Sequence, residues 1–353
     1  MTWRALHGKT PAPPMPGPER ITILGDGAMA TVCSILLTQG GHDVTMWGAF
    51  EESIDRLIQN REQSRLLKGV SIPPSVRLTA NDHECFDGAT LILCAIPTQY
   101  IRSVFTRLER HVPRGVPIVS VAKGIEVDTT LRPTQVVCDT LSPGVACPWP
   151  VAALSGPNIA AELAKYLPAT AVAASTDDAL ARRVQSAFST QWFRVYTNSD
   201  VVGVELAGAT KNIIAIAAGI LDGLAAGNNA KAALVTRGLV EITRLGVRLG
   251  AHESTFHGLA GLGDLITTCV SPEGRNRTVG EQLGKGRKLG EILAGMDSVA
   301  EGVPTTKAVR KLASQLGVEM PITEAVHSVL FEGKDVLHAL TELMTREPKP
   351  ERA

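Results

Sequence analysis

One lysine stands in a stretch that is otherwise built from small and aliphatic residues. Lys211 lies in the run from Glu205 to Gly219, where Ala, Gly and Ile predominate. Burying an unpaired ammonium group is costly in free energy. Lys211 is therefore either paired with a structural partner or positioned for chemistry, and its spacing alone does not decide between the two.

Two more polar segments follow in the same half of the chain. Asp264 closes the glycine-rich run 258–263, and it could act as a carboxylate at a site or cap the N-terminus of the next helix. The segment Gly274-Arg275-Asn276-Arg277 is polar and basic, so it could grip a phosphate group or form a solvated loop. Each segment has a functional and a structural interpretation.

A glycine pattern near the start of the chain indicates a nucleotide site. The pattern Gly25-x-Gly27-x-x-Ala30 follows a predicted strand and opens a predicted helix. The first glycine permits a tight turn, the second lets the backbone approach a pyrophosphate, and the third small residue lets helix and strand pack closely. The N–H groups at the helix start then face the phosphates. The alternative is a glycine turn of packing value only.

The end of the next predicted strand, from Trp47 to Glu52, bears on the choice of cofactor. Rossmann sites for NAD usually carry an acidic residue about 20 positions after the glycine pattern, which binds the ribose 2′-hydroxyl. Glu51 or Glu52 could accept that hydrogen bond and would repel a 2′-phosphate, and no Lys or Arg follows until Arg56. This pattern favours NAD over NADP. The alternative is that both glutamates only stabilise a helix N-terminus.

The elements that must position these residues change character along the chain. Strands are expected at 20–24, 42–47, 90–95, 117–122, 151–154 and 170–174, with helices at 31–39, 51–59 and 101–108. Continuous apolar strands that alternate with helices are typical of a parallel, doubly wound sheet covered on both faces. Beyond about residue 198 only helical periodicity remains, in the segments 201–226, 230–249, 279–283, 288–294, 303–316 and 322–330.

These patterns predict an α/β N-terminal Rossmann-type doubly wound sheet plus an all-α C-terminal domain. The sheet domain is expected at residues 20–198 and the helical substrate and catalytic domain at 199–344. Residues 1–19 are rich in proline and predict a disordered tail, and a second disordered tail is expected at 345–353.

Composition narrows the functional classes. The 353 residues carry 35 Lys and Arg against 35 Asp and Glu, and only 4% are aromatic, which disfavours a nucleic-acid binder. The six cysteines form no C-x-x-C pair, so we expect no metal site and, for the most part, buried reduced thiols in a cytoplasmic protein. No segment reaches the length of about 20 apolar residues that a membrane-spanning helix needs.

Many segments of the chain resemble the NAD(P)-dependent glycerol-3-phosphate dehydrogenase family, in family order over about residues 20–340. The matching segments are Gly25-x-Gly27, Pro97-Thr-Gln99, Val121-Ala-Lys123-Gly-Ile-Glu126, Leu154-Ser-Gly-Pro-Asn158-Ile-Ala160-x-Glu162, Lys211-Asn212, 227–239, 255–265, Arg275-Asn276-Arg277, Glu301-Gly302 and Pro321-Ile-Thr-Glu324. The resemblance implies reversible hydride transfer between NAD(P)H and dihydroxyacetone phosphate, giving sn-glycerol 3-phosphate for phospholipid synthesis. It also implies a homodimer.

The resemblance assigns roles to individual residues. Lys211 is similar to the catalytic lysine that exchanges a proton with the substrate oxygen, Lys123 to a second active-site lysine, and Asp264 to a carboxylate beside the reacting carbon. The implied substrate contacts are Lys123, Gly156, Asn158, Lys211, Asn212, Asp264, Thr268, Gly274, Arg275 and Asn276. The implied cofactor contacts are Gly25, Gly27, Ala28, Met29, Ala30, Phe50, Lys123, Ala160, Arg275, Val299 and Glu301. Lys123 would lower the pKa of Lys211 and Asp264 would raise it, and the sequence leaves the balance open.

The chain departs from the family pattern at two places. Ala49 and Phe50 stand where bacterial members often carry Arg, which again favours NAD. Gly274 stands where Ser is usual, so one phosphate hydrogen bond is missing or comes from the backbone N–H.

Two other functions are weighed against this one. A related β-hydroxyacid-type dehydrogenase would need a carboxylate-binding site in place of the phosphate grip. A non-catalytic NAD(H)-binding sensor or scaffold would have lost a catalytic residue, whereas Lys211, Lys123 and Asp264 are all present.

Overall fold

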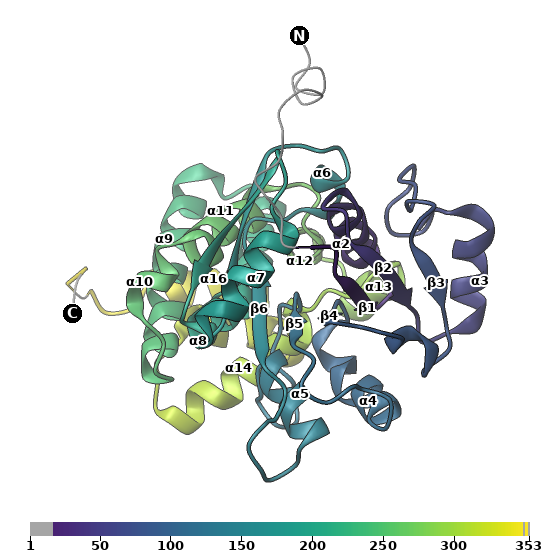
Figure 1. The fold of residues 1–353 in the computed structure, drawn as a ribbon. Helices are drawn as coiled ribbons and strands as arrows, with labels where there is room; N and C mark the ends of the chain where they lie inside the picture. The colour runs from purple at the N-terminus through teal and green to yellow at the C-terminus, as the bar shows by residue number, and fades with distance from the viewer. Residues whose placement is uncertain (1–16, 349, 352–353) are drawn as a thin grey trace.

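The computed structural model describes residues 17–348, 350 and 351 (Figure 1). The predicted disordered tail at 1–19 thus lies outside the described residues except for 17–19. Of the predicted tail at 345–353, residues 349, 352 and 353 also lie outside. Glu19 is held in place, because Arg183 Nε donates to its Oε1 over 3.0 Å.

The first part of the chain forms one eight-stranded sheet with the order β3-β2-β1-β4-β5-β6-β7-β8. Its strands are β1 (Arg20–Leu24), β2 (Asp43–Trp47), β3 (Arg77–Thr79), β4 (Leu91–Cys94), β5 (Ile118–Ser120), β6 (Val151–Ser155), β7 (Ala169–Ala174) and β8 (Phe193–Asn198). The Rossmann-type sheet is confirmed, although β3 and β8 were not predicted.

The predicted parallel sheet has one antiparallel pair of strands. Strands β6 and β7 pair antiparallel, whereas every other neighbouring pair in this sheet is parallel. A parallel connection usually crosses over through a full helix. The link between β6 and β7 contains only the four-residue helix α6 (Ala160–Leu163), so the chain turns back instead of crossing over.

Helices cover both faces of this sheet, as the apolar strands predicted. Helices α2 (Ala28–Gln39) and α7 (Asp178–Phe188) pack on one face, and α4 (Thr98–Leu108) and α5 (Pro133–Leu141) pack on the other. Within β4, Leu91 and Leu93 belong to the first core while Ile92 and Cys94 belong to the second. This alternation is the period of two expected for a strand buried on both sides. Helix α3 (Glu51–Asn60) lies at the β3 edge (Figure 1).

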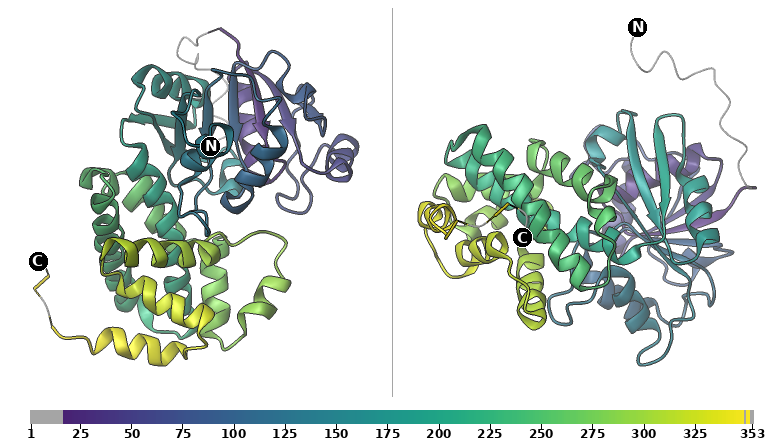
Figure 2. Two further views of the ribbon diagram at one scale, coloured as in Figure 1. Left: turned by 90° about the horizontal axis from the view of Figure 1, so that it is seen from below. Right: turned by 90° about the vertical axis from the view of Figure 1, so that its left-hand side faces the viewer.

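The remainder of the chain is helical and lies at one end of the sheet (Figure 2). Its helices are α8 (Val201–Gly223), α9 (Gly227–Arg248), α10 (Glu253–Phe256), α11 (Asp264–Val270), α12 (Arg275–Gly284), α13 (Leu289–Ala294), α14 (Gly302–Leu316), α15 (Pro321–Phe331) and α16 (Val336–Met344), with a π-helical turn at Leu259–Gly263. Helix α8 is the centre around which α9, α11, α12 and α14 pack.

Helices α8 and α12 approach so closely that only glycine fits between them. A Cβ atom on Gly219 would lie 1.9 Å from the carbonyl oxygen of Arg277, and one on Gly280 would lie 1.9 Å from that of Ile216. The backbones are therefore in direct contact. This contact fixes the start of α12, with its predicted phosphate-binding residues, relative to the helix that carries Lys211.

The expectation that no segment has the length of a membrane span is wrong for helix α8. Over its 23 residues it is long and apolar enough to cross a membrane by length and composition. However, 94% of its apolar window is buried inside the protein, so its hydrophobicity serves the core of the helical part.

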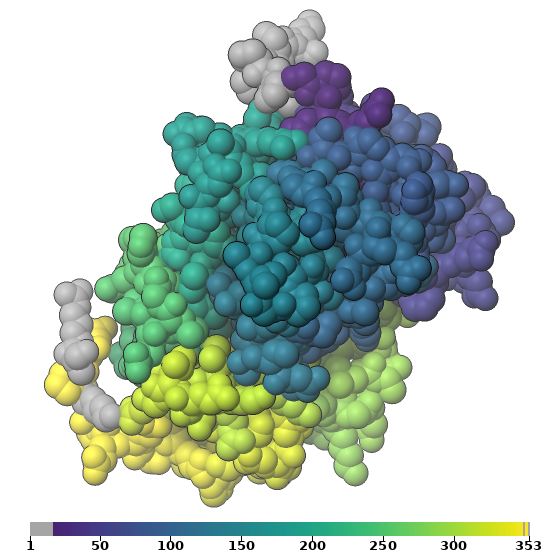
Figure 3. All heavy atoms as spheres, turned by 60° about the horizontal axis from the view of Figure 1, so that its bottom comes forward, coloured from purple at the N-terminus to yellow at the C-terminus, as the bar shows by residue number. Residues whose placement is uncertain are grey.

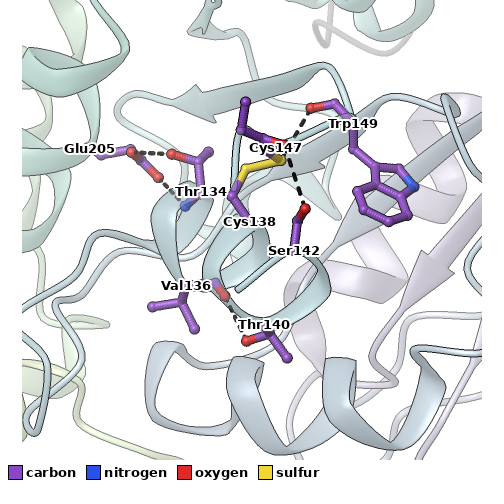
Figure 4. Close-up of a disulfide and its surroundings, with 9 residues drawn as sticks. Thr134, Val136, Cys138, Thr140, Ser142, Cys147, Trp149 and Glu205 are labelled. Atoms are coloured by element: carbon purple, nitrogen blue, oxygen red, sulfur yellow. Dashed lines mark hydrogen bonds between the residues drawn. A yellow bond between two sulfur atoms is a disulfide. The ribbon is translucent and has the colours of Figure 1, made fainter. Parts of the chain in front are cut away.

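The expectation that the cysteines are reduced thiols is wrong for two of the six. Cys138 of α5 and Cys147 form a disulfide with Cα atoms 5.2 Å apart, because the turn after α5 brings the chain back beside the helix (Figure 4). The remaining four are free and buried: Cys33, Cys85, Cys94 and Cys269. Burial raises the pKa of each of these thiols to about 12.

Candidate active site

Three charged side chains from distant segments meet where the sheet faces the helical part. Lys123 follows β5, Lys211 lies in the middle of α8, and Asp264 is the first residue of α11. The Nζ atom of Lys123 lies 2.7 Å from Oδ2 of Asp264, and Nζ of Lys211 lies 2.5 Å from Oδ1. One carboxylate thus joins two ammonium groups. The cluster lies at the carboxyl ends of the parallel strands, where α/β sheets bind their ligands.

This geometry decides two questions that the sequence left open. Lys211 is paired, and its partner is one of the residues predicted to act with it. Asp264 is not a helix cap, because Gly263 occupies that position and both carboxylate oxygens of Asp264 face lysines. The side chain of Asp264 is 2% exposed and that of Lys211 is 6% exposed, whereas Lys123 is 16% exposed.

The buried position of Lys211 changes its acidity. The pKa of Lys211 is lowered to about 8: loss of hydration is the largest cause and the charge of Lys123 acts in the same direction, while the charge and hydrogen bond of Asp264 partly oppose them. Desolvation disfavours the charged form of an amine. A lysine with a pKa near neutrality can both donate and accept a proton under physiological conditions.

Thr268 completes the surroundings of Lys211. Its Oγ1 accepts a hydrogen bond from Lys211 Nζ over 2.5 Å and donates to the Asp264 carbonyl over 2.6 Å, one helical turn back in α11. Asp264 and Thr268 are the two hydrogen-bond partners of this ammonium group within the part of the chain that the structure describes. An ammonium group has three donors, so the third proton of Lys211 is available to a substrate.

The predicted asparagine contacts hold the backbone around this cluster. Lys123 Nζ also donates to the Gly156 carbonyl over 2.8 Å. Asn158 Nδ2 donates to the Thr170 carbonyl over 3.0 Å, and Asn212 Nδ2 donates to the carbonyl of Lys123 over 2.8 Å. Asn212 therefore ties the segment that bears Lys123 to the helix that bears Lys211.

The start of α12 presents groups suited to an anion. Gly274 is the N-cap and no side chain caps this helix, so its first N–H groups are open to a ligand. Arg275 is exposed and has no ion pair among the described residues. Asn276 is buried, and its Oδ1 accepts from Gly302 N over 2.9 Å. A Cβ on Gly302 would lie 2.8 Å from both that Oδ1 and the Asn212 carbonyl, which places the start of α12 beside Asn212.

The turn between β1 and α2 fits a dinucleotide. Gly25 has a φ of 121°, and a Cβ there would lie 2.6 Å from the Ala95 carbonyl, so a side chain is excluded. Gly27 caps α2 without a side-chain hydrogen bond, and the first turn of α2 contains no acidic residue. The N–H groups of Ala28 and Met29 are thus open to a pyrophosphate. Ala30 is buried against the sheet, as the third small position requires.

The other predicted cofactor contacts lie in different settings. Phe50 precedes α3 and is 74% exposed, and Val299 is 36% exposed. Ala160 begins α6. Glu301 is already engaged, since its Oε1 accepts from Thr98 N over 2.8 Å and from Thr98 Oγ1 over 3.1 Å. It therefore links the start of α4 to the start of α14.

The structure also places a positively charged side chain at the end of β2, where the sequence spacing predicted none. Sequence reasoning found no Arg or Lys near the end of β2, but Arg107 of α4 reaches it and donates to the Ala49 carbonyl over 2.7 Å. The same guanidinium pairs with Asp82 through two contacts of 2.7 Å. Its charge is therefore largely neutralised. Glu51 and Glu52 are both exposed in the first turn of α3, where they complement the helix dipole.

Two links that sequence reasoning missed join the sheet to the helical part. Glu205 of α8 accepts from Thr134 N over 2.8 Å and from Thr134 Oγ1 over 2.7 Å (Figure 4). Arg132 also forms an ion pair with Glu205. Lys311 of α14 donates to the Asp128 carbonyl over 2.7 Å. In the space-filling view the blue-teal surface of the sheet part lies against the yellow-green surface of the C-terminal helices (Figure 3). These contacts hold α8, and hence Lys211, against the strand ends.

Together, a doubly wound sheet with a glycine turn at the start of α2 and a lysine–aspartate cluster from the helical part define a dinucleotide-dependent dehydrogenase. The chain belongs to the NAD-dependent glycerol-3-phosphate dehydrogenase family. The model of that family's N-terminus matches residues 20–181, and the model of its C-terminus matches residues 200–341.

Individual relatives agree along nearly the whole chain. The glycerol-3-phosphate dehydrogenase of Citrifermentans bemidjiense is 48% identical over 94% of this chain and 99% of the relative. That of Chlorobium limicola is 49% identical over the same shares. Among solved structures, the glycerol-3-phosphate dehydrogenase of Coxiella burnetii is 35% identical with a TM-score of 0.89, covering 94% of this chain and 100% of that one. The resemblance inferred from the motifs is confirmed.

Proposed function

We propose that this chain catalyses reversible hydride transfer between a nicotinamide dinucleotide and dihydroxyacetone phosphate, giving sn-glycerol 3-phosphate. The observation that carries the proposal is the buried cluster in which Asp264 bridges Lys123 and Lys211. Such a cluster suits a ketone reduction because negative charge grows on the carbonyl oxygen, where an ammonium group stabilises it and supplies a proton.

Each member of the cluster has a separate task in this proposal. Lys211 donates its third proton to the carbonyl oxygen in reduction and recovers it in oxidation. Asp264 and Thr268 fix the direction of that ammonium group. Lys123, the more exposed lysine, adds positive charge beside the same oxygen and is held by the Gly156 carbonyl.

The substrate phosphate is assigned to the start of α12. The open N–H groups after Gly274 and the guanidinium of Arg275, which has no ion pair among the described residues, provide charge-assisted donors for it. Where Ser is usual in the family, the N–H groups of this helix start take its place. Binding the phosphate far from the reacting carbon orients the ketone toward Lys211.

The cofactor is assigned to the turn at Gly25–Ala30, with Phe50, Ala160, Val299 and Glu301 around it. The bound dinucleotide supplies or accepts the hydride, and NAD is favoured over NADP. In this arrangement residues 20–198 bind the dinucleotide, and residues 199–344 supply the substrate site.

A spectrophotometric assay tests the function. Purified protein is mixed with dihydroxyacetone phosphate and either NADH or NADPH, and loss of absorbance is followed. Rapid oxidation of NADH and slow oxidation of NADPH are expected. Oxidation of neither, with cofactor binding intact, would contradict the proposal. The Arg275→Ala variant separates the β-hydroxyacid alternative, because a phosphate-free substrate would keep its rate in that variant.

We further propose that the protein acts as a homodimer in the cytoplasm, where its product enters phospholipid synthesis. Family membership supports both statements. The Cys138–Cys147 disulfide opposes the second one, because reducing compartments rarely contain disulfides. Light scattering on the purified protein tests the dimer. Alkylation of free thiols in freshly broken cells tests the compartment, since a cytoplasmic protein is expected to have both cysteines labelled.

A further inference from the structure

The phosphate-binding turn of this chain contains an acidic residue, Asp26, between its two glycines. Its carboxylate does not cap α2. Instead, Oδ2 accepts a hydrogen bond from Ser53 Oγ of α3 over 2.5 Å, so the side chain points away from the helix start and toward the end of β2. The backbone is also fixed, because Gln63 Nε2 donates to the Asp26 carbonyl over 2.5 Å.

The carboxylate lies where a dinucleotide site for NAD usually has an acidic side chain. That acidic residue follows the glycine pattern by about 20 positions and binds the ribose 2′-hydroxyl. Here the residue directly after β2 is Gly48, which has no side chain, and a Cβ on it would lie 3.1 Å from Oδ2 of Asp26. The side chain of Ile54, whose Cδ1 would lie 2.8 Å from that Cβ, and the carboxylate of Asp26 therefore both border the space beside Gly48, and Asp26 is the charged one of the two.

We infer that Asp26 determines cofactor specificity, accepting a hydrogen bond from the ribose 2′-hydroxyl of the dinucleotide and repelling a 2′-phosphate. This inference rests on the proposed function for the presence of a dinucleotide. In this role Asp26 takes the place that the sequence pattern gave to Glu51 and Glu52, both of which are exposed in the first turn of α3.

The surrounding cations do not cancel this role. Arg107 also reaches the end of β2, but Asp82 binds its guanidinium through two contacts of 2.7 Å. Arg56 lies one turn beyond Ser53 on α3 and is exposed to solvent. A charge at the surface is screened by water, whereas the partly buried carboxylate of Asp26 is screened less. Asp26 therefore keeps its negative charge beside the end of β2, where Arg107 is paired with Asp82 and Arg56 is exposed.

Binding titrations of the full-length protein test the inference without turnover. The dissociation constants of NAD+ and NADP+ are measured by quenching of tryptophan fluorescence for the wild type, Asp26→Asn, and the matched control Glu51→Gln/Glu52→Gln. Removing one charge beside a phosphate is expected to improve NADP+ binding relative to NAD+ by about tenfold or more in Asp26→Asn. The control is expected to keep the wild-type ratio. An unchanged ratio in Asp26→Asn, or the same change in the control, would overturn the inference.

A second measurement tests the inference even if Asp26→Asn does not fold, as the loss of its cooperative melting transition would show. It uses only the wild type, which is titrated with ADP-ribose and with the 2′-phosphate of ADP-ribose. ADP-ribose is expected to bind more tightly, and equal affinity would overturn the inference. Binding of NAD+ without reduction of dihydroxyacetone phosphate would refute the proposed function and leave the role of Asp26 standing.

Discussion

The pKa of Lys211 predicts how the rate depends on pH. In reduction Lys211 must carry its proton, and its pKa is lowered to about 8, first by burial and then by Lys123. The rate constant kcat/KM for dihydroxyacetone phosphate should therefore be constant below about pH 7.5 and fall about tenfold for each pH unit above about 8.5. In oxidation Lys211 must be neutral, so kcat/KM for glycerol 3-phosphate should rise over the same interval.

Two variants move this transition in opposite directions. Lys123→Met removes a like charge that lowers the pKa of Lys211, so the transition should move to higher pH. Asp264→Asn removes the opposite charge 2.5 Å from Lys211 Nζ, so the transition should move to lower pH by about one unit or more. Both variants will be slower, but the position of the transition does not depend on the maximal rate.

The assay is the initial rate of NADH oxidation at low dihydroxyacetone phosphate, measured from about pH 5.5 to about 10 in buffers of constant ionic strength, so that a transition moved in either direction stays within the range. Rates of formation of NADH from glycerol 3-phosphate serve as the control, because an alkaline loss of folding would depress both directions. A transition that stays at the same pH in both variants would refute the assignment of the titrating group to Lys211.

Three further outcomes follow from the structure. Arg275→Ala should raise KM for dihydroxyacetone phosphate by about tenfold or more, because a charge-assisted phosphate contact is lost. The affinity for NADH in the same preparation should change less. An unchanged KM would show that Arg275 does not bind the substrate phosphate. Reduction of the Cys138–Cys147 disulfide should destabilise the protein by about 2–3 kcal/mol, because the unfolded chain loses the constraint of the short closed loop. Calorimetry with and without dithiothreitol measures this change. The control variant Cys138→Ser should no longer respond to the reductant. Gly219→Ala should prevent the close packing of α8 on α12, and an unchanged melting temperature would contradict that contact.

The local pattern of apolar, glycine and helix-forming residues was sufficient to predict much of the fold. The glycine turn, the apolar strands and the change to helices near residue 198 are all set by neighbours in sequence. The antiparallel direction of β7 was missed because it depends on whether the link from β6 forms a full crossover helix, and the sequence pattern there did not reveal that α6 has only four residues. The Cys138–Cys147 disulfide was missed for a similar reason, since it depends on a turn that brings two cysteines together.

The site likewise combines features that the sequence predicts with features that only the folded structure shows. The motifs singled out Lys123, Lys211 and Asp264, but their contact joins residues 141 and 53 positions apart. The balance between burial and charge that sets the pKa of Lys211 required the three-dimensional arrangement. Spacing along the sequence predicts an acidic residue shortly after β2 and so favours Glu51 and Glu52, which are exposed. Asp26 lies before β2 in the sequence and comes close to the end of that strand only in the folded protein.

The most direct test of the central claim is the turnover of Lys211→Met with dihydroxyacetone phosphate and NADH, measured alongside NADH affinity. Methionine fills the buried volume, and Asp264 keeps Lys123 as its partner. The account predicts that kcat falls by about 1000-fold or more while the dissociation constant of NADH stays within about threefold of the wild type. A loss in kcat of less than about tenfold, in a variant that melts like the wild type, would show that another group transfers the proton.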